Sequence, residues 1–216
     1  MVMPAFNKKI AETQCVNCGQ CRVFCPTGAI SIHTNTDKVF KALADPDVRV
    51  VAQVAPAVRV AVGDHYGLQK GRSVMGKIVN ALHRMGFDEV YDTTFSADLT
   101  IMEEGSEFLE RLKHKEDYQW PMFTSCCPGW VRFLKSQYPH LVPQLSTAKS
   151  PQQMFGSVMK SYFAESIGVK PENMFTVSIM PCVAKKGESN MELFYGEYAG
   201  HETDVVLTTR ELTRMI

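Results

Sequence analysis

Short apolar runs alternate along this chain with longer stretches whose apolar residues recur at helical spacing. The apolar runs predict strands over 48–55, 89–94, 121–126, 174–180 and the first part of 204–216. The helical stretches cover 36–45, 73–86, 96–113, 129–138, 150–168 and the end of 204–216. Strands that alternate with helices are typical of α/β architecture, so the pattern predicts an α/β fold around a parallel sheet.

The pattern also divides the chain into parts of unequal length. Residues 1–34 are rich in loops and cysteine, and residues 35–46 form a helical linker. The alternation of strands and helices then runs over 47–216, which we expect to be one large α/β domain. In such folds ligands bind at the carboxyl ends of the strands, and three segments follow predicted strands there: "APAV", "TSCCPGW" and "MPCVAKKGE".

The composition is that of an ordinary globular protein, and it narrows the range of partners. The 216 residues are 45% apolar and 21% charged, and 23 Lys and Arg balance 23 Asp and Glu. A chain without net charge has no overall field to attract nucleic acid or an anionic membrane, so we expect neither partner. The N-terminus lacks the apolar core of a signal peptide and no apolar run is long enough to span a membrane, which favours a cytoplasmic location.

The chain contains seven cysteines, and their spacing indicates metal binding rather than disulfides. An odd number in tight spacing, with no sign of secretion, argues against a disulfide framework. The cysteines form two groups: Cys15, Cys18, Cys21 and Cys25, and then Cys126, Cys127 and Cys182. This division predicts two metal-bearing regions.

The first group has the C-x2-C-x2-C-x3-C-P spacing of bacterial ferredoxins, which bind [4Fe-4S] clusters. A structural zinc site is the alternative, but zinc loops usually lack the third close cysteine and the proline. In two-cluster ferredoxins the fourth cysteine of each run ligates the other cluster. Only one run is present here, so Cys25 has no partner cluster and the first three cysteines lack a fourth ligand.

The second group begins with two adjacent thiols, Cys126 and Cys127, in the sequence "TSCCPGW". Neighbouring cysteines rarely bond to each other, because the ring that they would close is strained. Successive side chains also leave the backbone in different directions, so the pair is poorly placed to bind one metal together. We therefore expect the two thiols to have separate roles. Pro128 and Gly129 shape a sharp loop suited to presenting a ligand.

Together, "TSCCPGW" and "MPCVAKKGE" resemble the first two signature segments of the catalytic subunit of iron-only ([FeFe]) hydrogenase. The resemblance extends through "APAVR", "ADLTIMEEGSEF", "SPQQ" and "TTREL", and covers essentially the whole chain. It implies a ferredoxin-like segment followed by parallel-sheet α/β lobes of the iron hydrogenase type, and reversible formation of H2 from protons and electrons. Besides [4Fe-4S], the implied cofactor is the H-cluster, a cubane joined to a diiron unit that carries CO, cyanide and a dithiolate bridge.

The resemblance also implies roles for individual residues. Cys127 and Cys182 would ligate the cubane, whereas Cys126 would face the diiron unit and exchange protons, which a thiol does at modest cost. Lys185 would donate a charge-assisted hydrogen bond to a cyanide, with Glu188 as its support. The diiron pocket would be lined by Ala55, Pro56, Ala57 and Gln152, with Met180 packed beside the cluster.

A buried site also needs a path for protons, and the resemblance implies the order Glu107, Ser146, Glu104 and Cys126 from outside inward. Glu104 and Glu107 are three residues apart, which places them on one side of a predicted helix. Glu104 flanks an apolar stripe, so we expect it to be partly buried, with Glu107 nearer to solvent. The stripe consists of Ile101, Phe108 and Leu112. Taken alone, the two glutamates also fit a solvated helix face.

The family's third signature segment, which supplies two further cysteines, is absent from these residues, so we expect the C-terminal part of the domain to be missing. A longer gene product or a second polypeptide would complete the site, and we expect no hydrogenase activity from this chain alone. The expected electron partner is a ferredoxin or another redox protein. Two alternatives are a non-catalytic relative that acts as an iron–sulfur assembly or sensor protein, and a simple electron carrier. Retention of Cys126 and Lys185 favours the enzyme.

Overall fold

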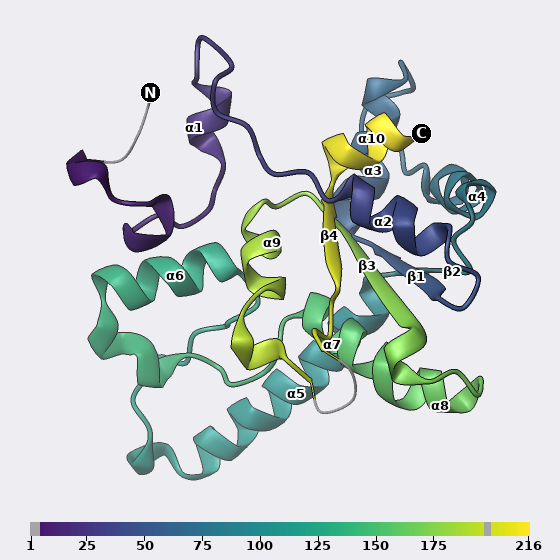
Figure 1. Ribbon diagram of the computed structural model, residues 1–216. Coiled ribbons are helices and arrows are strands. Elements are labelled where there is room, and N and C mark those ends of the chain that lie inside the picture. Colours follow the sequence, from purple (N-terminus) through teal and green to yellow (C-terminus); the bar gives the residue numbers. More distant parts are fainter. Residues whose placement is uncertain (1–4, 197–199) are drawn as a thin grey trace.

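A parallel four-stranded sheet lies at the centre of the computed structural model, which describes residues 5–196 and 200–216 (Figure 1). The strands are ordered β2-β1-β3-β4, and each neighbouring pair is parallel. Their bounds are Arg49–Val54 for β1, Glu89–Asp92 for β2, Met174–Met180 for β3 and Val205–Thr208 for β4. The predicted α/β fold with a parallel sheet is therefore confirmed.

The inner strand β1 is buried on both faces, which explains why most of its residues are apolar. Val50, Ala52 and Val54 have exposed fractions of 1% or less and belong to the core on one face of the sheet. Val51 belongs to a second cluster on the other face, where it packs with Phe155. Parallel strands that are covered on both faces favour such continuous runs of branched apolar residues over alternation.

Helices cover both faces of the sheet. One face carries α2 (Thr36–Leu43), α3 (Pro56–His65), α4 (Met75–Met85) and α10 (Thr209–Met215). The other carries α7 (Pro151–Val158), which continues through a π turn (Met159–Phe163) into α8 (Ala164–Ser166). Against α7 packs the long helix α5 (Thr94–Lys113). Short 3₁₀ turns cover Ala5–Asn7, Ile10–Glu12, Lys115–Asp117, Pro139–Gln144, Pro171–Asn173 and Glu192–Phe194.

The cysteine-bearing segments lie beyond the sheet, where α6 (Pro128–Gln137) packs against α9 (Ala184–Ser189). The N-terminal segment, with the short helix α1 (Gln20–Val23), lies next to these two helices (Figure 1). Its first four residues lie outside the described part of the chain. Asn35, directly after this segment, contacts the sheet: the Nδ2 of Asn35 donates to the carbonyl oxygen of Val206 in β4 at 3.2 Å.

One predicted strand is wrong, and one helix was not predicted. Residues 121–126 do not form a strand of the sheet: Phe123 makes only an isolated parallel bridge with Leu145. The backbone of the following residues is engaged elsewhere, since Ser125 N–H faces Glu104 and the Cys126 carbonyl faces Lys185. The sequence pattern also missed α3, which begins at Pro56, directly after the strand predicted over 48–55. Proline suits the first position of a helix, because its missing N–H would have no partner there.

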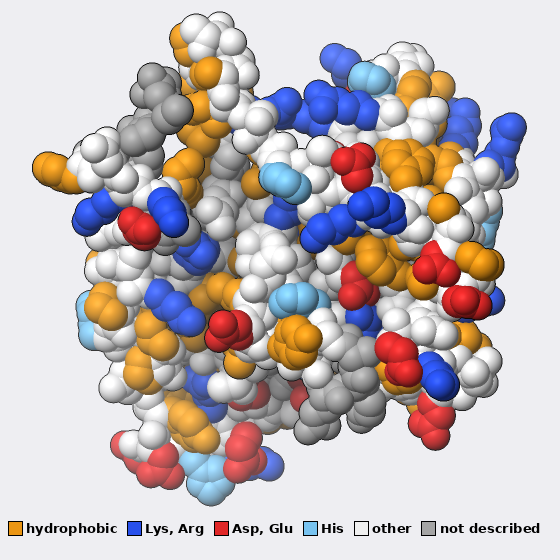
Figure 2. Space-filling view, in the orientation of Figure 1, with side chains coloured by type: hydrophobic (Ala, Val, Ile, Leu, Met, Phe, Trp, Pro, Cys, Tyr) orange, Lys and Arg blue, Asp and Glu red, His pale blue; other side chains and the backbone are white. Residues whose placement is uncertain are grey.

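Side chains of both charges occur on the visible face of the molecule (Figure 2). No helix in the described part of the chain combines the length and the apolar character needed to cross a membrane.

Candidate metal and proton-transfer site

The two cysteine motifs of the larger domain, far apart in sequence, meet between α6 and α9. Cys126 and Cys127 directly precede α6, and Cys182 lies between β3 and α9. The Lys185 ammonium donates to the Cys126 carbonyl oxygen at 2.8 Å, across 59 positions of sequence. This contact fixes the doublet against the turn that carries Cys182.

Glu188 is the centre of the polar network behind Lys185. Its carboxylate is buried and lies 2.9 Å from the Lys185 ammonium. It also accepts hydrogen bonds from Ser150 Oγ and Gln152 Nε2, each at 3.0 Å. A buried carboxylate needs such partners, because burial removes it from water. The network holds the Lys185 ammonium beside the Cys126 carbonyl.

Cys127 is fixed at the start of α6. It is the N-cap of this helix, and its sulfur accepts the backbone N–H of Trp130 at 3.5 Å. Both Cys126 and Cys127 are exposed and Cys182 is partly exposed, so all three thiols are accessible to an incoming cofactor.

Four of the residues that the resemblance places around the diiron unit lie at the carboxyl ends of the two inner strands. Ala55 follows β1, and its N–H donates to the Ile179 carbonyl of β3 at 3.0 Å. Ala55 and Met180 are each 5% exposed, whereas Pro56 and Ala57 are exposed at the start of α3. Gln152 comes from α7, where it is fully buried and hydrogen-bonded to Glu188.

The proton-path residues form two hydrogen-bonded groups. At one end Ser146 Oγ donates to Glu107 Oε2 at 2.7 Å. At the other, Ser125 N–H faces Glu104 Oε1 at 3.4 Å, next to Cys126. Ala148 lies between the two groups: its N–H donates to Ser146 Oγ at 3.1 Å and its carbonyl accepts from Ser125 Oγ at 2.9 Å. Hydrogen bonds thus connect Glu107 and Ser146 through Ala148 and Ser125 to Glu104.

The environment of these glutamates differs from the expectation. The predicted apolar stripe of α5 is exposed, at 68% for Ile101, 43% for Phe108 and 49% for Leu112. The buried face of the helix is polar instead and consists of Ser96, Thr100 and Arg111. Helical periodicity predicts that the more apolar face of α5 is buried. The polar face is buried instead, because segment 144–150, which packs against it, presents carbonyl and hydroxyl groups.

Glu107, which we expected nearer to solvent, is turned inward against this segment. Its carboxylate pairs with the buried guanidinium of Arg111 and accepts from Ser146 and Thr147 N–H. Burial by itself raises the pKa of Glu107, but the hydrogen bonds from Ser146 and Arg111 outweigh it and hold the pKa below its ordinary value. The group is therefore anionic near neutral pH.

The N-terminal run presents its four cysteines on an open loop. Cys18 and Cys21 are exposed, and Cys15 and Cys25 are partly exposed. The sulfur of Cys15 accepts the N–H of Asn17 at 3.4 Å, and a hydrogen bond from Thr27 lowers the pKa of Cys25 to about 7. Hydrogen bonds to cysteine sulfur are a feature of iron–sulfur loops, where they tune the reduction potential.

Across residues 5–196 and 200–216, no three His, Cys, Asp or Glu side chains are gathered closely enough to hold one metal ion. The exposed and partly exposed thiols of the N-terminal run suit a cubane, which spreads its ligands over four iron atoms.

Several contacts of the site carried no signal in the sequence. Arg111 pairs with Glu107 and donates to the Leu145 carbonyl, and Arg132 of α6 donates from Nε to the Cys15 carbonyl at 3.0 Å. Both arginines lie outside the motifs. Ser125 and Ser150 lie within "TSCCPGW" and "SPQQ", but only the structure shows their contacts with Glu104 and Glu188.

Comparison with known proteins gives two family matches. Residues 48–216 match the model of the iron only hydrogenase large subunit, C-terminal domain, and residues 8–31 match that of the 4Fe-4S binding domain.

Individual relatives are similar over most of this chain. The chain is 50% identical over 220 residues to NADP-reducing hydrogenase subunit HndD of Solidesulfovibrio fructosivorans, which covers 100% of this chain and 37% of that protein. It is 37% identical over 171 residues to cytosolic Fe-S cluster assembly factor narfl of Danio rerio, over 77% of this chain and 41% of that protein. A solved structure of apo [FeFe]-hydrogenase HydA1 from Chlamydomonas reinhardtii aligns with a TM-score of 0.79 at 45% identity, over 85% of this chain and 47% of that one. The chain thus spans less than half the length of each.

Proposed function

Because the chain belongs to the iron-only hydrogenase large-subunit family, we propose that it is part of the catalytic subunit of an [FeFe] hydrogenase. Its cofactors are a 4Fe-4S cluster in the N-terminal segment and the H-cluster of the large-subunit domain. The observation that carries the proposal is the hydrogen bond from Lys185 to the Cys126 carbonyl. It joins a thiol doublet, a third thiol and a cation at one edge of a parallel sheet.

The three thiols would divide into anchors and a proton carrier. Cys127, at the N-terminus of α6, and Cys182, after β3, would hold the cubane of the H-cluster, which supplies the centre where protons and electrons combine. Cys126 would exchange protons at its Sγ, because its exposed side chain leaves the backbone in a different direction from that of Cys127. Lys185, held by Glu188, would orient a charge-assisted hydrogen bond toward an anionic ligand of the cofactor.

Protons would reach Cys126 through the two glutamates of α5. Glu107, anionic near neutral pH, would accept a proton and pass it to the Ser146 hydroxyl, to which it is already hydrogen-bonded. Glu104, beside Ser125, would connect Ser146 to the doublet. The polar face of α5 is suited to this role, since a proton path needs groups that both donate and accept.

Electrons would enter through the N-terminal run, with Cys15, Cys18 and Cys21 as ligands of one cluster and Cys25 available to another. The electron partner would be a ferredoxin or another redox protein. The two further cysteines of the H-cluster would come from a remaining part of a longer protein or from a second polypeptide, so this chain alone would lack activity. We also propose that the chain divides into an N-terminal segment (1–34), a linker (35–46) and the large-subunit domain (47–216), and that the protein is cytoplasmic.

An iron–sulfur assembly or sensor role is the second candidate, because the assembly factor from Danio rerio is similar over most of this chain. The higher identity to a hydrogenase subunit favours catalysis. So does the presence of Cys126 and Lys185, since a scaffold needs neither a proton carrier nor a donor for cyanide. An electron carrier would not need the ordered carboxylates of α5.

Infrared spectroscopy of the matured complex distinguishes these functions. We expect bands from metal-bound CO and cyanide for a hydrogenase and none for an assembly protein. Cys126→Ala should abolish turnover, a loss of at least about 100-fold, while the bands remain. Bands that vanish with Cys126→Ala would instead make this thiol a structural anchor. Cys18→Ser is the matched control: it should lower the iron content of the N-terminal segment and leave the bands unchanged.

A further inference from the structure

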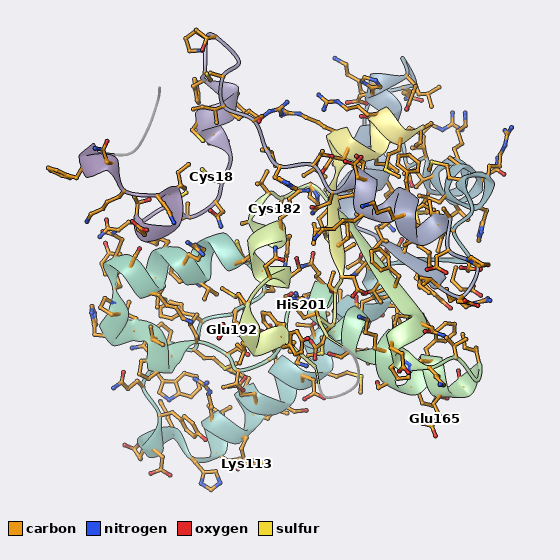
Figure 3. The ribbon with its side chains drawn as sticks, viewed as in Figure 1. Cys18, Lys113, Glu165, Cys182, Glu192 and His201 are labelled. Atoms are coloured by element: carbon orange, nitrogen blue, oxygen red, sulfur yellow. The ribbon has the colours of Figure 1, made fainter. Side chains whose placement is uncertain are left out.

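The N-terminal cysteine loop is seated on α6 and α9 by close contacts next to Cys182. Asn17 adopts a left-handed conformation with a φ of 58°, and its side chain lies over Gly187, where a Cβ would stand 2.8 Å from Asn17 Nδ2. A Cβ on Gly19 would likewise approach Val183 Cγ2 at 3.2 Å. Cys18 and Cys182 lie on these neighbouring elements (Figure 3). The fit leaves the loop little room to shift along α9.

One cation of α6 takes part in this contact. Arg132 Nε donates to the Cys15 carbonyl oxygen at 3.0 Å, and its side chain is partly buried between the helix and the loop. Among residues 5–196 and 200–216, no carboxylate lies within 4.0 Å of its guanidinium to form an ion pair. Its positive charge lies beside the backbone of Cys15, the first cysteine of the run.

We propose that Arg132 is a positioning residue that docks the Cys15–Cys21 loop onto α6 and raises the reduction potential of the cluster bound there. The inference rests on the proposed 4Fe-4S role of the loop. Reduction adds one electron, taken from an external one-electron donor, and thus one negative charge to a site already surrounded by thiolates. A nearby cation stabilises that added charge by Coulomb attraction, so it favours the reduced form. Arginine suits the role because it stays charged and its planar fork holds a fixed hydrogen bond.

A redox titration of the reconstituted chain, followed by the electron paramagnetic resonance signal of the reduced cluster, tests the charge. With Arg132→Gln we expect the ratio of reduced to oxidised cluster at a fixed potential to fall by roughly 3- to 10-fold, where 10-fold corresponds to about 59 mV for one electron. Lys135→Gln, which removes an exposed positive charge from the same helix, is the matched control and should leave the ratio nearly unchanged. An equal shift in both variants, or none in Arg132→Gln, would overturn the proposal.

Amide hydrogen exchange of the metal-free chain tests the docking separately. Arg132→Gln should raise the exchange rates of residues 15–21 about 10-fold, and Lys135→Gln should not. Unchanged rates in Arg132→Gln would contradict the docking role. Neither measurement needs the H-cluster: an assembly protein would still show both effects, whereas missing CO and cyanide bands would refute only the hydrogenase function.

Discussion

At the scale of single residues, the tightest backbone contact of a glycine joins α7 to the segment before β4. A Cβ built on Gly156 would overlap the Glu202 carbonyl oxygen and stand 2.6 Å from its carbon and 2.9 Å from Thr203 Oγ1. The obstacle is backbone rather than a flexible side chain, so a larger residue requires α7 or the segment to move.

Gly156→Ala should therefore lower the free energy of unfolding by roughly 2–4 kcal/mol, because overpacking a buried site forces backbone shifts. Urea denaturation followed by circular dichroism measures the change. Gly105→Ala, in the middle of α5, is the control: no atom lies within 4 Å of its added Cβ, and alanine there should add about 0.5–1 kcal/mol. Equal effects of both substitutions would refute the close contact.

At the level of single residues, the sequence identifies the motif residues but not the side chains that contact them. The family resemblance implies that Cys182, Lys185 and Glu188 share a site, and in the structure the Lys185 ammonium lies 2.9 Å from the Glu188 carboxylate. Ser150 and Arg132 join from segments 38 and 117 positions away from the residues they contact. Such contacts depend on the tertiary fold, so no local pattern encodes them.

At the scale of elements, sequence patterns identified every strand of the sheet and failed where the environment was polar. The inner strands β1 and β3 are mainly apolar because both faces of the sheet are covered, and the pattern of apolar residues detects that directly. In α5 the buried side is polar and the apolar side is exposed. The pattern of apolar residues therefore predicted the wrong face of this helix as buried. The false strand at 121–126 had the composition of a strand, but only Phe123 pairs as one.

One carboxylate joins three elements and should make their packing sensitive to acid. Glu211 caps α10, pairs with Lys186 of α9 at 2.8 Å and accepts the N–H of Asn35 before α2 at 2.9 Å. Burial by itself raises the pKa of Glu211, but hydrogen bonds from Lys186 and Thr208 outweigh it and hold the folded-state pKa below the ordinary value of 4.5. Its contribution to stability is thus complete above about pH 4.5 and is lost as the pH falls through the folded-state pKa.

Glu211→Gln should therefore lower the free energy of unfolding by roughly 1–3 kcal/mol at pH 7, and by progressively less below pH 4.5. The comparison is made by urea unfolding of both proteins at several pH values. Glu192→Gln, at an exposed glutamate, should change stability by less than about 0.5 kcal/mol at either pH. A difference that stays constant as the pH falls would show that the carboxylate charge is not what joins these elements.

At the scale of the whole molecule, three parts of the fold supply the residues of the proposed site. Ala55 and Met180 lie at the carboxyl ends of β1 and β3, the doublet and Cys182 precede α6 and α9, and α5 brings Glu104 to the backbone of Ser125. The expectation that chemistry gathers at strand ends pointed to the first two of these parts. The third followed from the family resemblance, because the position of α5 relative to the doublet depends on packing against α7.

This arrangement predicts that Ser146 controls proton supply without holding the cofactor. Its hydroxyl donates to Glu107 and accepts from Ala148 N–H, and it touches none of the three thiols of the larger domain within hydrogen-bond distance in the described structure. In the complete, matured enzyme Ser146→Ala should lower turnover by about 100-fold or more, since the relay loses its middle group. The infrared bands of CO and cyanide should persist, because the substitution leaves Cys127 and Cys182 unchanged.

The control is Ser136→Ala, which removes a hydroxyl that donates to the Phe133 carbonyl within α6. It should leave both the turnover and the infrared bands unchanged. Full activity in Ser146→Ala would mean that protons enter by another route and that the α5 carboxylates serve only to fix the helix.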